Sequence, residues 1–263
     1  MSDILVTEHP FEPEMILIPA GEFLMGSDPE KDPHATADEQ PQHTFYLPDY
    51  AVARTPVTNA QYAAFLQATG YDPPAHWKIL FWKKRWPPRG RQEYPVVRVS
   101  WHDARAYCQW LSGATGKLYR LPNEAEWEKA ARGTDGRIYP WGDEWDPQRC
   151  NTVERNGQED TSPVAAYPQG ASPYGLLDAI GNVWEWTRSL WGRKLRQPEF
   201  TYPYDPSDGR ENLEAASDIR RVLRGVSYFN DRQVARCAAR YRYSPYNSYV
   251  SVGFRVARSF HST

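Results

Sequence analysis

The cysteines and histidines, which could act as nucleophiles or as ligands of soft metals, are few and scattered. The chain has three cysteines, Cys108, Cys150 and Cys237. Their odd number and wide spacing are typical neither of a disulfide framework nor of a CxxC metal site. The histidines show no pair at the HxxxH spacing that places two rings on one helix face. They are His9, His34, His43, His76, His102 and His261. With neither a glycine-rich phosphate loop nor a nucleophile–base pairing, the sequence does not indicate a catalytic centre.

The C-terminal part of the chain concentrates side chains that suit binding. Its tyrosines within 226–251 are Tyr228, Tyr241, Tyr243, Tyr246 and Tyr249. Tyrosine, serine and asparagine dominate evolved binding loops, because tyrosine supplies rigid amphipathic area and the others adaptable hydrogen bonds. In an extended segment, residues 241 and 243 point to one face. The pattern favours ligand contact. The alternative is ordinary packing in an aromatic-rich fold, although a core prefers Leu, Ile and Val.

Composition sets limits on partners and location. The 263 residues carry a net charge of −2, which gives no reason to expect nucleic acid or an anionic membrane as a partner. No apolar run is long enough to span a bilayer. The first residues lack a secretory signal, so we expect a cytoplasmic protein. The stretch 76–91 mixes aromatic and basic residues and could bind phosphates. We favour a solvated loop whose aromatic rings pack inward.

Local patterns predict a mixed α and β domain. Residues 15–25 resemble a hairpin, 44–54 a strand, and 221–258 a pair of hairpin strands. Helices are predicted from Thr58 to Thr69, after Ser100, and from about Pro122. Residues 133–220 favour short strands in long loops. With no linker or repeat, the simplest organisation is one domain over 1–263 of the α+β class.

Seven ordered motifs resemble those of the formylglycine-generating-enzyme (sulfatase-modifying-factor) family. They are GEFLMGS at 21–27, ARTPVTNAQYAAFLQATGY at 53–71, PVVRVSWHDARAYCQWLS at 95–112, YRLPNEAEWEKAARG at 119–133, YPWGDEWDPQRCN at 139–151, GLLDAIGNVWEW at 175–186, and RVLRGVSYF with VGFRVAR near the end. Together they cover nearly the whole chain. The resemblance implies an irregular, loop-rich variant of the C-type lectin fold.

The family contains oxidases that make formylglycine, iron-dependent sulfoxide synthases, and non-enzymatic binding domains. The oxidases use two cysteines near the C-terminus, and thiolates suit a soft metal such as Cu(I). The matching stretch here, NDRQVARCAARYRYSP, contains only Cys237. The sulfoxide synthases take their iron ligands from histidines of an additional N-terminal domain, which this sequence does not show. We therefore predict a protein that is not an enzyme and has no catalytic cofactor.

The resemblance also implies two structural calcium sites, because calcium favours mixed carboxylate and carbonyl oxygens. The first would use Asp178 and Glu185 with the carbonyl groups of Gly181 and Val183. The second would use Asn151 and Asn156 with the carbonyl groups of Thr152 and Gln158, although Asn156 stands where a carboxylate is usual. The alternative is that these residues only cap turns.

Residues 224–256 further resemble the variable region of proteins diversified by diversity-generating retroelements. Those systems introduce errors at template adenines, so that Asn codons become Tyr, Phe, Ser, Val or Asp but not Trp, Met, Gln, Lys or Glu. The positions predicted to contact a ligand are Val226, Tyr228, Phe229, Asn230, Asp231, Val234, Tyr241, Tyr243, Tyr246, Asn247, Ser248, Tyr249, Val250 and Ser251. Most of them depart from the family's usual residues and contain only permitted types.

These observations predict a ligand-binding protein with a diversified surface. We expect the ligand to be a protein, while its identity, its affinity and the oligomeric state stay open. The alternatives are a binding or regulatory module of fixed specificity, and an oxidase of the formylglycine-generating or sulfoxide-synthase type. The lectin-like fold by itself does not imply a sugar ligand.

Overall fold

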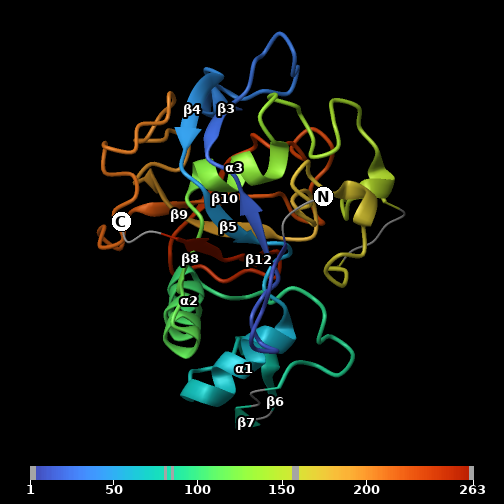
Figure 1. The fold of residues 1–263 in the computed structure, drawn as a ribbon, viewed down its shortest axis with the longest axis vertical. Helices are drawn as coiled ribbons and strands as arrows, with labels where there is room; N and C mark the ends of the chain where they lie inside the picture. The colour runs from blue at the N-terminus through green and yellow to red at the C-terminus, as the bar shows by residue number, and fades with distance from the viewer. Residues whose placement is uncertain (1–3, 80–81, 84–85, 156–159, 261–263) are drawn as a thin grey trace.

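The larger of two main sheets joins both ends of the chain. The computed structural model describes residues 4–79, 82–83, 86–155 and 160–260 (Figure 1). Five strands of this sheet lie in the order β1-β2-β5-β13-β8. They are β1 (Ile4–Leu5), β2 (Met15–Ile18), β5 (Tyr50–Ala53), β13 (Ala257–Ser259) and β8 (Leu118–Arg120). All neighbours in it are antiparallel.

The second main sheet carries the C-terminal segment. Its strands lie in the order β11-β10-β9-β12. They are β11 (Tyr241–Tyr243), β10 (Arg220–Arg224), β9 (Trp184–Gly192) and β12 (Val252–Gly253). The last strand runs parallel to β9, with Val252 opposite Trp184. This pairing returns the chain from the loops after β11 to the opposite edge of the sheet, beside β9.

Two short hairpins complete the strands. One consists of β3 (Gly21–Met25) and β4 (His43–Leu47), and the other of β6 (Lys78–Ile79) and β7 (Trp82–Lys83). Isolated turns of 3-10 helix occur at Ala37–Glu39, Ala75–Trp77, Pro147–Arg149 and Pro168–Gly170.

Three helices begin at strong capping signals. They are α1 (Asn59–Thr69), α2 (Trp101–Thr115) and α3 (Glu124–Arg132). Thr58, Ser100 and Asn123 are their N-caps, and each forms a reciprocal capping box with the third helical residue. The first two predicted helices are confirmed. The third begins later than predicted, because Asn123 is the cap and Pro122 precedes it.

Two predicted strand pairings are wrong. The strands of 15–25 do not pair with each other, since β2 pairs with β5 and β3 pairs with β4. The two ends of 221–258 also separate, because β10 joins β9 and β13 joins β5. Residues 44–54 form two strands that break at Pro48. Alternation of apolar residues reports which side chains are buried and does not identify the partner strand.

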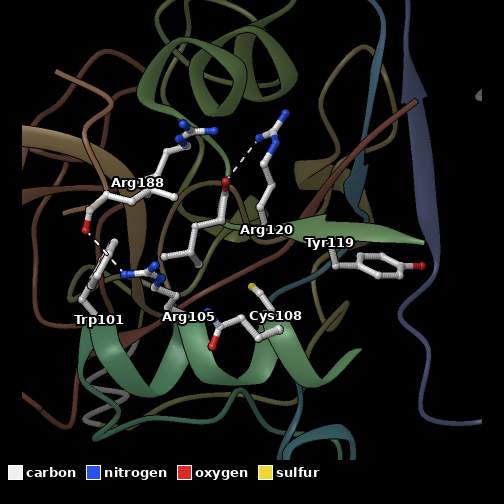
Figure 2. A pocket seen from close by; sticks show the side chains of 9 residues that line it. Trp101, Arg105, Cys108, Tyr119, Arg120 and Arg188 are labelled. Atoms are coloured by element: carbon white, nitrogen blue, oxygen red, sulfur yellow. Dashed lines mark hydrogen bonds between the residues drawn. The ribbon is translucent and has the colours of Figure 1, made fainter. Parts of the chain in front are cut away.

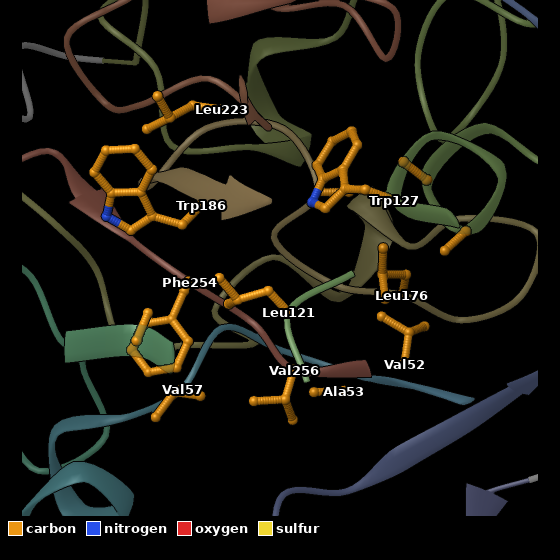
Figure 3. Packing of buried hydrophobic residues seen from close by; sticks show 14 of the residues in the cluster. Val52, Ala53, Val57, Leu121, Trp127, Leu176, Trp186, Leu223, Phe254 and Val256 are labelled. Carbon is orange, nitrogen blue, oxygen red and sulfur yellow. The ribbon is translucent and has the colours of Figure 1, made fainter. Parts of the chain in front are cut away.

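The core is rich in tryptophan and lies between the two main sheets and the helices. Figure 3 shows Trp127 and Trp186 packed together with Leu121, Phe254 and other apolar residues. The indole N–H of Trp186 donates to the carbonyl oxygen of Val99 at 3.0 Å, and that of Trp127 donates to Glu185 at 2.7 Å. Buried indoles thus keep hydrogen-bond acceptors, which lowers the cost of burying them.

The architecture is an irregular α+β fold, as predicted, with short helices and long loops. Among the described residues, no helix is both long and apolar enough to cross a membrane.

Candidate ligand-binding site

Buried arginines fasten the C-terminal segment to the rest of the chain. Arg255 makes two contacts of 2.6 Å with Glu185. Arg236 pairs with Glu39 and, at 2.9 Å, with Asp32. The N-terminal end of α3 holds two more arginines of this kind, Arg224 and Arg240, which share Glu124. Bidentate guanidinium–carboxylate pairs fix geometry well, so the loops between these arginines start from rigid positions.

Backbone hydrogen bonds hold the loops that follow β11. The N–H of Trp101 donates to the carbonyl oxygen of Pro245 at 3.1 Å, and that of Arg98 to Tyr249 at 3.0 Å. The N–H of Trp184 donates to Ser251 at 2.8 Å. The loop of residues 244–251 is therefore attached at three points, and Tyr246 and Ser248 between the first two of them are exposed.

We define the aromatic surface as Phe229, Tyr241, Tyr243, Tyr246 and Tyr249. Three of these rings form a connected series with Trp184: Trp184 stacks on Tyr241 with centroids 5.3 Å apart, Tyr241 lies 5.1 Å from Tyr243, and Tyr243 lies 4.5 Å from Tyr249. The other two rings contact residues outside this series, Tyr246 packing on His102 and Phe229 on Tyr228. Phe229, Tyr246 and Tyr249 are 56%, 63% and 43% exposed. Large rings held at the surface in this way are suited to contact a partner.

Two of the predicted contact residues are not on the surface. Val226 is fully buried at a φ of +64°, and Ser251 is 9% exposed next to β12. The prediction that these side chains contact a ligand is wrong, because the backbone turns both of them into the core. Tyr228 is also buried, at 4% exposed, but one side of it lines a cavity.

Some of the predicted polar contact residues stabilise turns, and others are exposed. The side-chain oxygen of Asn230 accepts from the indole of Trp184 at 3.1 Å, and that of Asn247 accepts from the N–H of Ser244 at 3.1 Å. These two asparagines hold the loop shape. The remaining predicted positions are exposed or half-buried: Asp231, Val234, Ser248 and Val250.

A cavity of about 380 Å³ adjoins the aromatic surface. Tyr228 and Val250 from the C-terminal segment form one wall. The other residues lining it are Asn59, His76, Pro88, Arg91, Tyr94, Pro95, Val97, Arg98, Asp160 and Thr161. The cavity therefore joins five separate stretches of the chain, which explains why the sequence alone did not indicate it.

Some hydrogen-bonding groups of this cavity have no partner among the described residues. The side-chain oxygen Oδ1 of Asn59 is buried and has no donor among the described residues. Burial and the charge of Arg98 lower the pKa of His76 to about 4, so His76 is neutral at pH 7. Arg91 pairs with Asp160 at 2.5 Å, whereas the side chain of Arg98 is exposed. A ligand group that both donates and accepts would suit this set.

The basic stretch 76–91 contributes His76, Pro88 and Arg91 to the cavity wall. The sequence favours a solvated loop for the whole stretch, whereas these three residues line a cavity. Trp77 is buried, as predicted for the aromatic rings of this stretch, but Trp86 is 65% exposed, so the prediction is wrong for that ring. The side chains of residues 78–85 lie outside those described.

All three cysteines are free and buried. Burial raises the pKa of the Cys150 and Cys237 thiols to about 12, and that of Cys108 above its ordinary value as well. A nucleophilic or metal-binding cysteine needs its thiolate form, which a raised pKa disfavours at neutral pH. These thiols therefore lack the environment of a reactive cysteine.

The predicted calcium ligands differ in whether their side-chain oxygens are free to bind a cation. Glu185 is already bound by Arg255 and Trp127, so its charge is neutralised. Among the described residues, the buried Asp178 accepts a hydrogen bond from the N–H of Ala165 at 2.7 Å, and the buried Oδ1 of Asn151 has no donor. These two residues fit a cation. Asn156 and Gln158 lie outside the described residues. The rest of the two sets, Thr152, Gly181 and Val183, is buried.

The two predicted calcium sites lie side by side, because Asn151 forms a β-bridge with Gly181. Within the described part of the chain, no three Asp, Glu, His or Cys side chains gather as a metal cluster. A calcium ion at these adjoining sites would need backbone carbonyl oxygens as most of its ligands. Calcium binding stays a prediction.

Replacing Asp178 with Asn tests the charge at this place. Burial raises the pKa of Asp178 to about 6 in the folded protein. The unfolded chain loses this proton near the ordinary value of about 3.9, so deprotonation between these values favours unfolding. We expect the stability of the wild type relative to Asp178→Asn to fall by about 3 kcal/mol as pH rises from 4 to 7 without divalent cations. Thermal unfolding at each pH measures it.

Asparagine is a conservative choice there, because it tolerates the φ of +54° that Asp178 adopts. If calcium binds, millimolar calcium at pH 7 will raise the Tm of the wild type and not that of Asp178→Asn. Identical Tm values for the wild type with calcium and with EDTA would remove calcium from the account.

The fold and the motifs define the class of protein. Residues 4–260 match the family described as "Sulfatase-modifying factor enzyme 1-like domain". The chain therefore belongs to the family of formylglycine-generating enzymes and sulfatase-modifying factors.

Relatives of both kinds, active and inactive, are similar to it. The "Inactive C-alpha-formylglycine-generating enzyme 2" of Mus musculus is 32% identical over 95% of this chain and 87% of its own length. The "Formylglycine-generating enzyme" of Streptomyces coelicolor is 35% identical over 92% of this chain and 88% of its own. Overall identity therefore does not separate the active relatives from the inactive ones.

Two solved structures share the fold over nearly the whole chain. PvdO from Pseudomonas aeruginosa superposes with a TM-score of 0.77 at 28% identity, covering 98% of each chain. Treponema denticola variable protein 1 superposes with a TM-score of 0.72 at 22% identity, again covering 98% of each chain. The second likeness establishes a common fold.

Proposed function

We propose that this protein is a non-catalytic ligand-binding protein whose C-terminal segment contacts the ligand and is diversified at the gene level. The observation that carries the proposal is the contrast within residues 224–256. Arg224, Arg236, Arg240 and Arg255 are at most 5% exposed and paired with carboxylates. Of the aromatic rings between them, Phe229, Tyr246 and Tyr249 are exposed and take no part in those pairs, so they could change without disturbing them.

The composition of the aromatic surface supports a protein ligand. Tyrosine and phenylalanine bury large areas at low side-chain entropy cost and are frequent hot-spot residues. The rings support one another at 4.5–5.3 Å from Trp184 to Tyr249, so the surface is partly ordered before binding. Preorganisation of this kind lowers the entropy lost on association.

The adjoining cavity supplies a place for one projecting group of the ligand. Its Asn59 acceptor and the exposed Arg98 guanidinium would both be satisfied by a side-chain or backbone amide. Because Tyr228 and Val250 line the cavity and belong to the C-terminal segment, changes there would alter the shape of the cavity together with the surface.

The buried state of the three thiols argues against the oxidase alternative. Copper uptake together with thiol oxidation would support that alternative and contradict ours. In the alternative of a binding module with fixed specificity, the same surface would contact the ligand. The difference is that the codons for this surface would not vary between copies of the gene.

A photo-crosslinking experiment tests whether the aromatic surface contacts a ligand. Tyr246 is replaced by p-benzoylphenylalanine in the full chain, which is expressed in its source cells. Tyr46 on β4 is the matched control, because it is exposed to nearly the same degree, 59% against 63%. We expect a discrete crosslinked protein at Tyr246 that excess unlabelled protein suppresses. Equal products at both positions, or none at Tyr246, would contradict the proposed function.

A further inference from the structure

A second cavity, of about 170 Å³, lies between α2 and the strands β8 and β9, away from the C-terminal segment (Figure 2). Its floor is apolar and buried, formed by Trp101, Cys108 and Leu121, each at most 4% exposed. Residues at its mouth are accessible, since Leu213 is 36% exposed and Gln109 is also exposed. None of the predicted contact residues lines it.

Three arginines line the cavity. Figure 2 shows Arg105 on α2, with Arg120 and Arg188 on the strands above it. Arg120 is matched by Glu126, with two contacts of 2.6 Å. Within the part of the chain that the structure describes, the one carboxylate that pairs with Arg105 is Glu214, whose side chain is 78% exposed, and exposed partners compensate charge weakly.

Arg188 is compensated incompletely. Its Nε lies 3.2 Å from Oε2 of Glu211, yet the two atoms are not aligned for a hydrogen bond. Burial raises the pKa of Glu211, although hydrogen bonds from Ser189 and Tyr204 and the charge of Arg188 oppose this rise. Among the described residues, Nε of Arg188 therefore has no hydrogen-bond acceptor, and the Arg188 side chain lines the cavity.

A fourth arginine, Arg221, adds buried positive charge behind Trp101. It is 2% exposed, its guanidinium lies 4.0 Å from the Trp101 ring, and among the described residues it binds only carbonyl oxygens, with no carboxylate partner. Burial, with the like charges of Arg105 and Arg188, lowers the pKa of Arg221 to about 10 despite the opposing effect of Glu211. An anion in the cavity would relieve this excess of positive charge.

The size and lining of the cavity define what would fit. A protein cavity of about 150 Å³ lined by apolar groups accommodates benzene. Guanidinium groups recognise carboxylates through paired, charge-assisted hydrogen bonds. We propose that this cavity binds a small monocarboxylate whose apolar part is about the size of a benzene ring. Its carboxylate would contact Arg105 and Arg188, and its apolar part would pack on Leu121 and Cys108.

Binding of sodium benzoate, compared with benzyl alcohol, tests the proposal. The two probes have similar size and differ in charge. At about tenfold excess over Kd, benzoate should raise the Tm by about 3–6 °C and show saturable transfer of magnetisation by NMR. Benzyl alcohol should do neither. Absence of a benzoate effect, or equal binding of both probes, would overturn the proposal.

Two variants locate the site. Arg105→Met keeps the length of a half-exposed side chain and should weaken benzoate binding about tenfold or more. Leu213→Trp at the mouth should block it. Arg193→Met is the control, because Arg193 is an exposed arginine outside the cavity and should bind benzoate as the wild type does. Unchanged benzoate binding in both Arg105→Met and Leu213→Trp would place the ligand elsewhere and overturn the assignment.

Discussion

Replacing Glu124 with Ala is expected to lower the stability of this protein by about 3–5 kcal/mol, the effect of breaking a buried ion pair from one side. Glu124 is fully buried at the first position of α3. It accepts two hydrogen bonds from Arg240, at 2.7 and 3.0 Å, and one from Arg224 at 3.1 Å. Removing it leaves Arg240 buried with carbonyl groups alone. For a chain of this size the loss corresponds to a fall in Tm of about 6–20 °C.

A variant of an exposed ion pair and the pH dependence of stability both test whether the buried ion pair causes that loss. Asp218→Ala breaks the exposed pair with Arg193, whose side chains are 57% and 60% exposed, and should change stability by less than about 1 kcal/mol. Burial alone would raise the pKa of Glu124, but the charges of Arg240 and Arg224 outweigh it and hold that pKa below its ordinary value.

The pH dependence follows from that sign. A carboxylate with a lowered folded pKa stabilises the protein above its unfolded pKa of about 4.3 and loses that contribution as pH falls. The difference in Tm between the wild type and Glu124→Gln should therefore narrow in acid. A difference that does not change with pH would contradict the ion-pair account.

The helices could be predicted from the sequence because their signals are local. Thr58, Ser100 and Asn123 each stand three residues before a side chain that completes a capping box. Such a motif requires no knowledge of the rest of the fold. Gly70 and Gly116 end the first two helices in the left-handed conformation, as glycine commonly does.

Strand partners and burial in the C-terminal segment could not be predicted in the same way. The sequence predicts Val226 at the surface as one of the positions that contact a ligand, yet the backbone places it in the core at positive φ. Only tertiary contacts decide such cases. Motif order indicated the positions of Tyr243, Tyr246 and Tyr249, but their connection to Trp184 through ring contacts depends on sheet order.

The cavities were not predictable, for a similar reason. Arg98, Asn59 and Asp160 belong to segments with no shared motif, and only the fold brings them to one wall with Tyr228. The single signal within the sequence was the basic stretch that ends at Arg91, and charge pattern alone does not distinguish a cavity wall from a solvated loop.

Replacing both Tyr246 and Tyr249 with Ala should separate binding from stability. Their side chains are 63% and 43% exposed, so each truncation should change stability by no more than about 0.5 kcal/mol. Central aromatic residues of an interface typically contribute 2 kcal/mol or more, so we expect affinity for the crosslinked ligand to fall at least about 30-fold. Thermal unfolding and competition with the wild type measure the two effects.

Tyr46→Ala is the control for this pair, since Tyr46 is 59% exposed on β4. It should leave both Tm and affinity unchanged. A large loss of Tm in the double variant would mean that the two tyrosines are structural, and an unchanged affinity would remove them from the binding surface.

Deep sequencing of the 3′ end of the gene in a population of the source organism tests the diversified surface most directly. The account predicts variation at the codons of exposed residues such as Phe229, Tyr243 and Tyr249, with the codons of the buried residues Arg224 and Arg255 fixed. A nearby template copy should carry adenines at the varying positions. An invariant 3′ end without such a copy would contradict diversification and leave a binding module of fixed specificity.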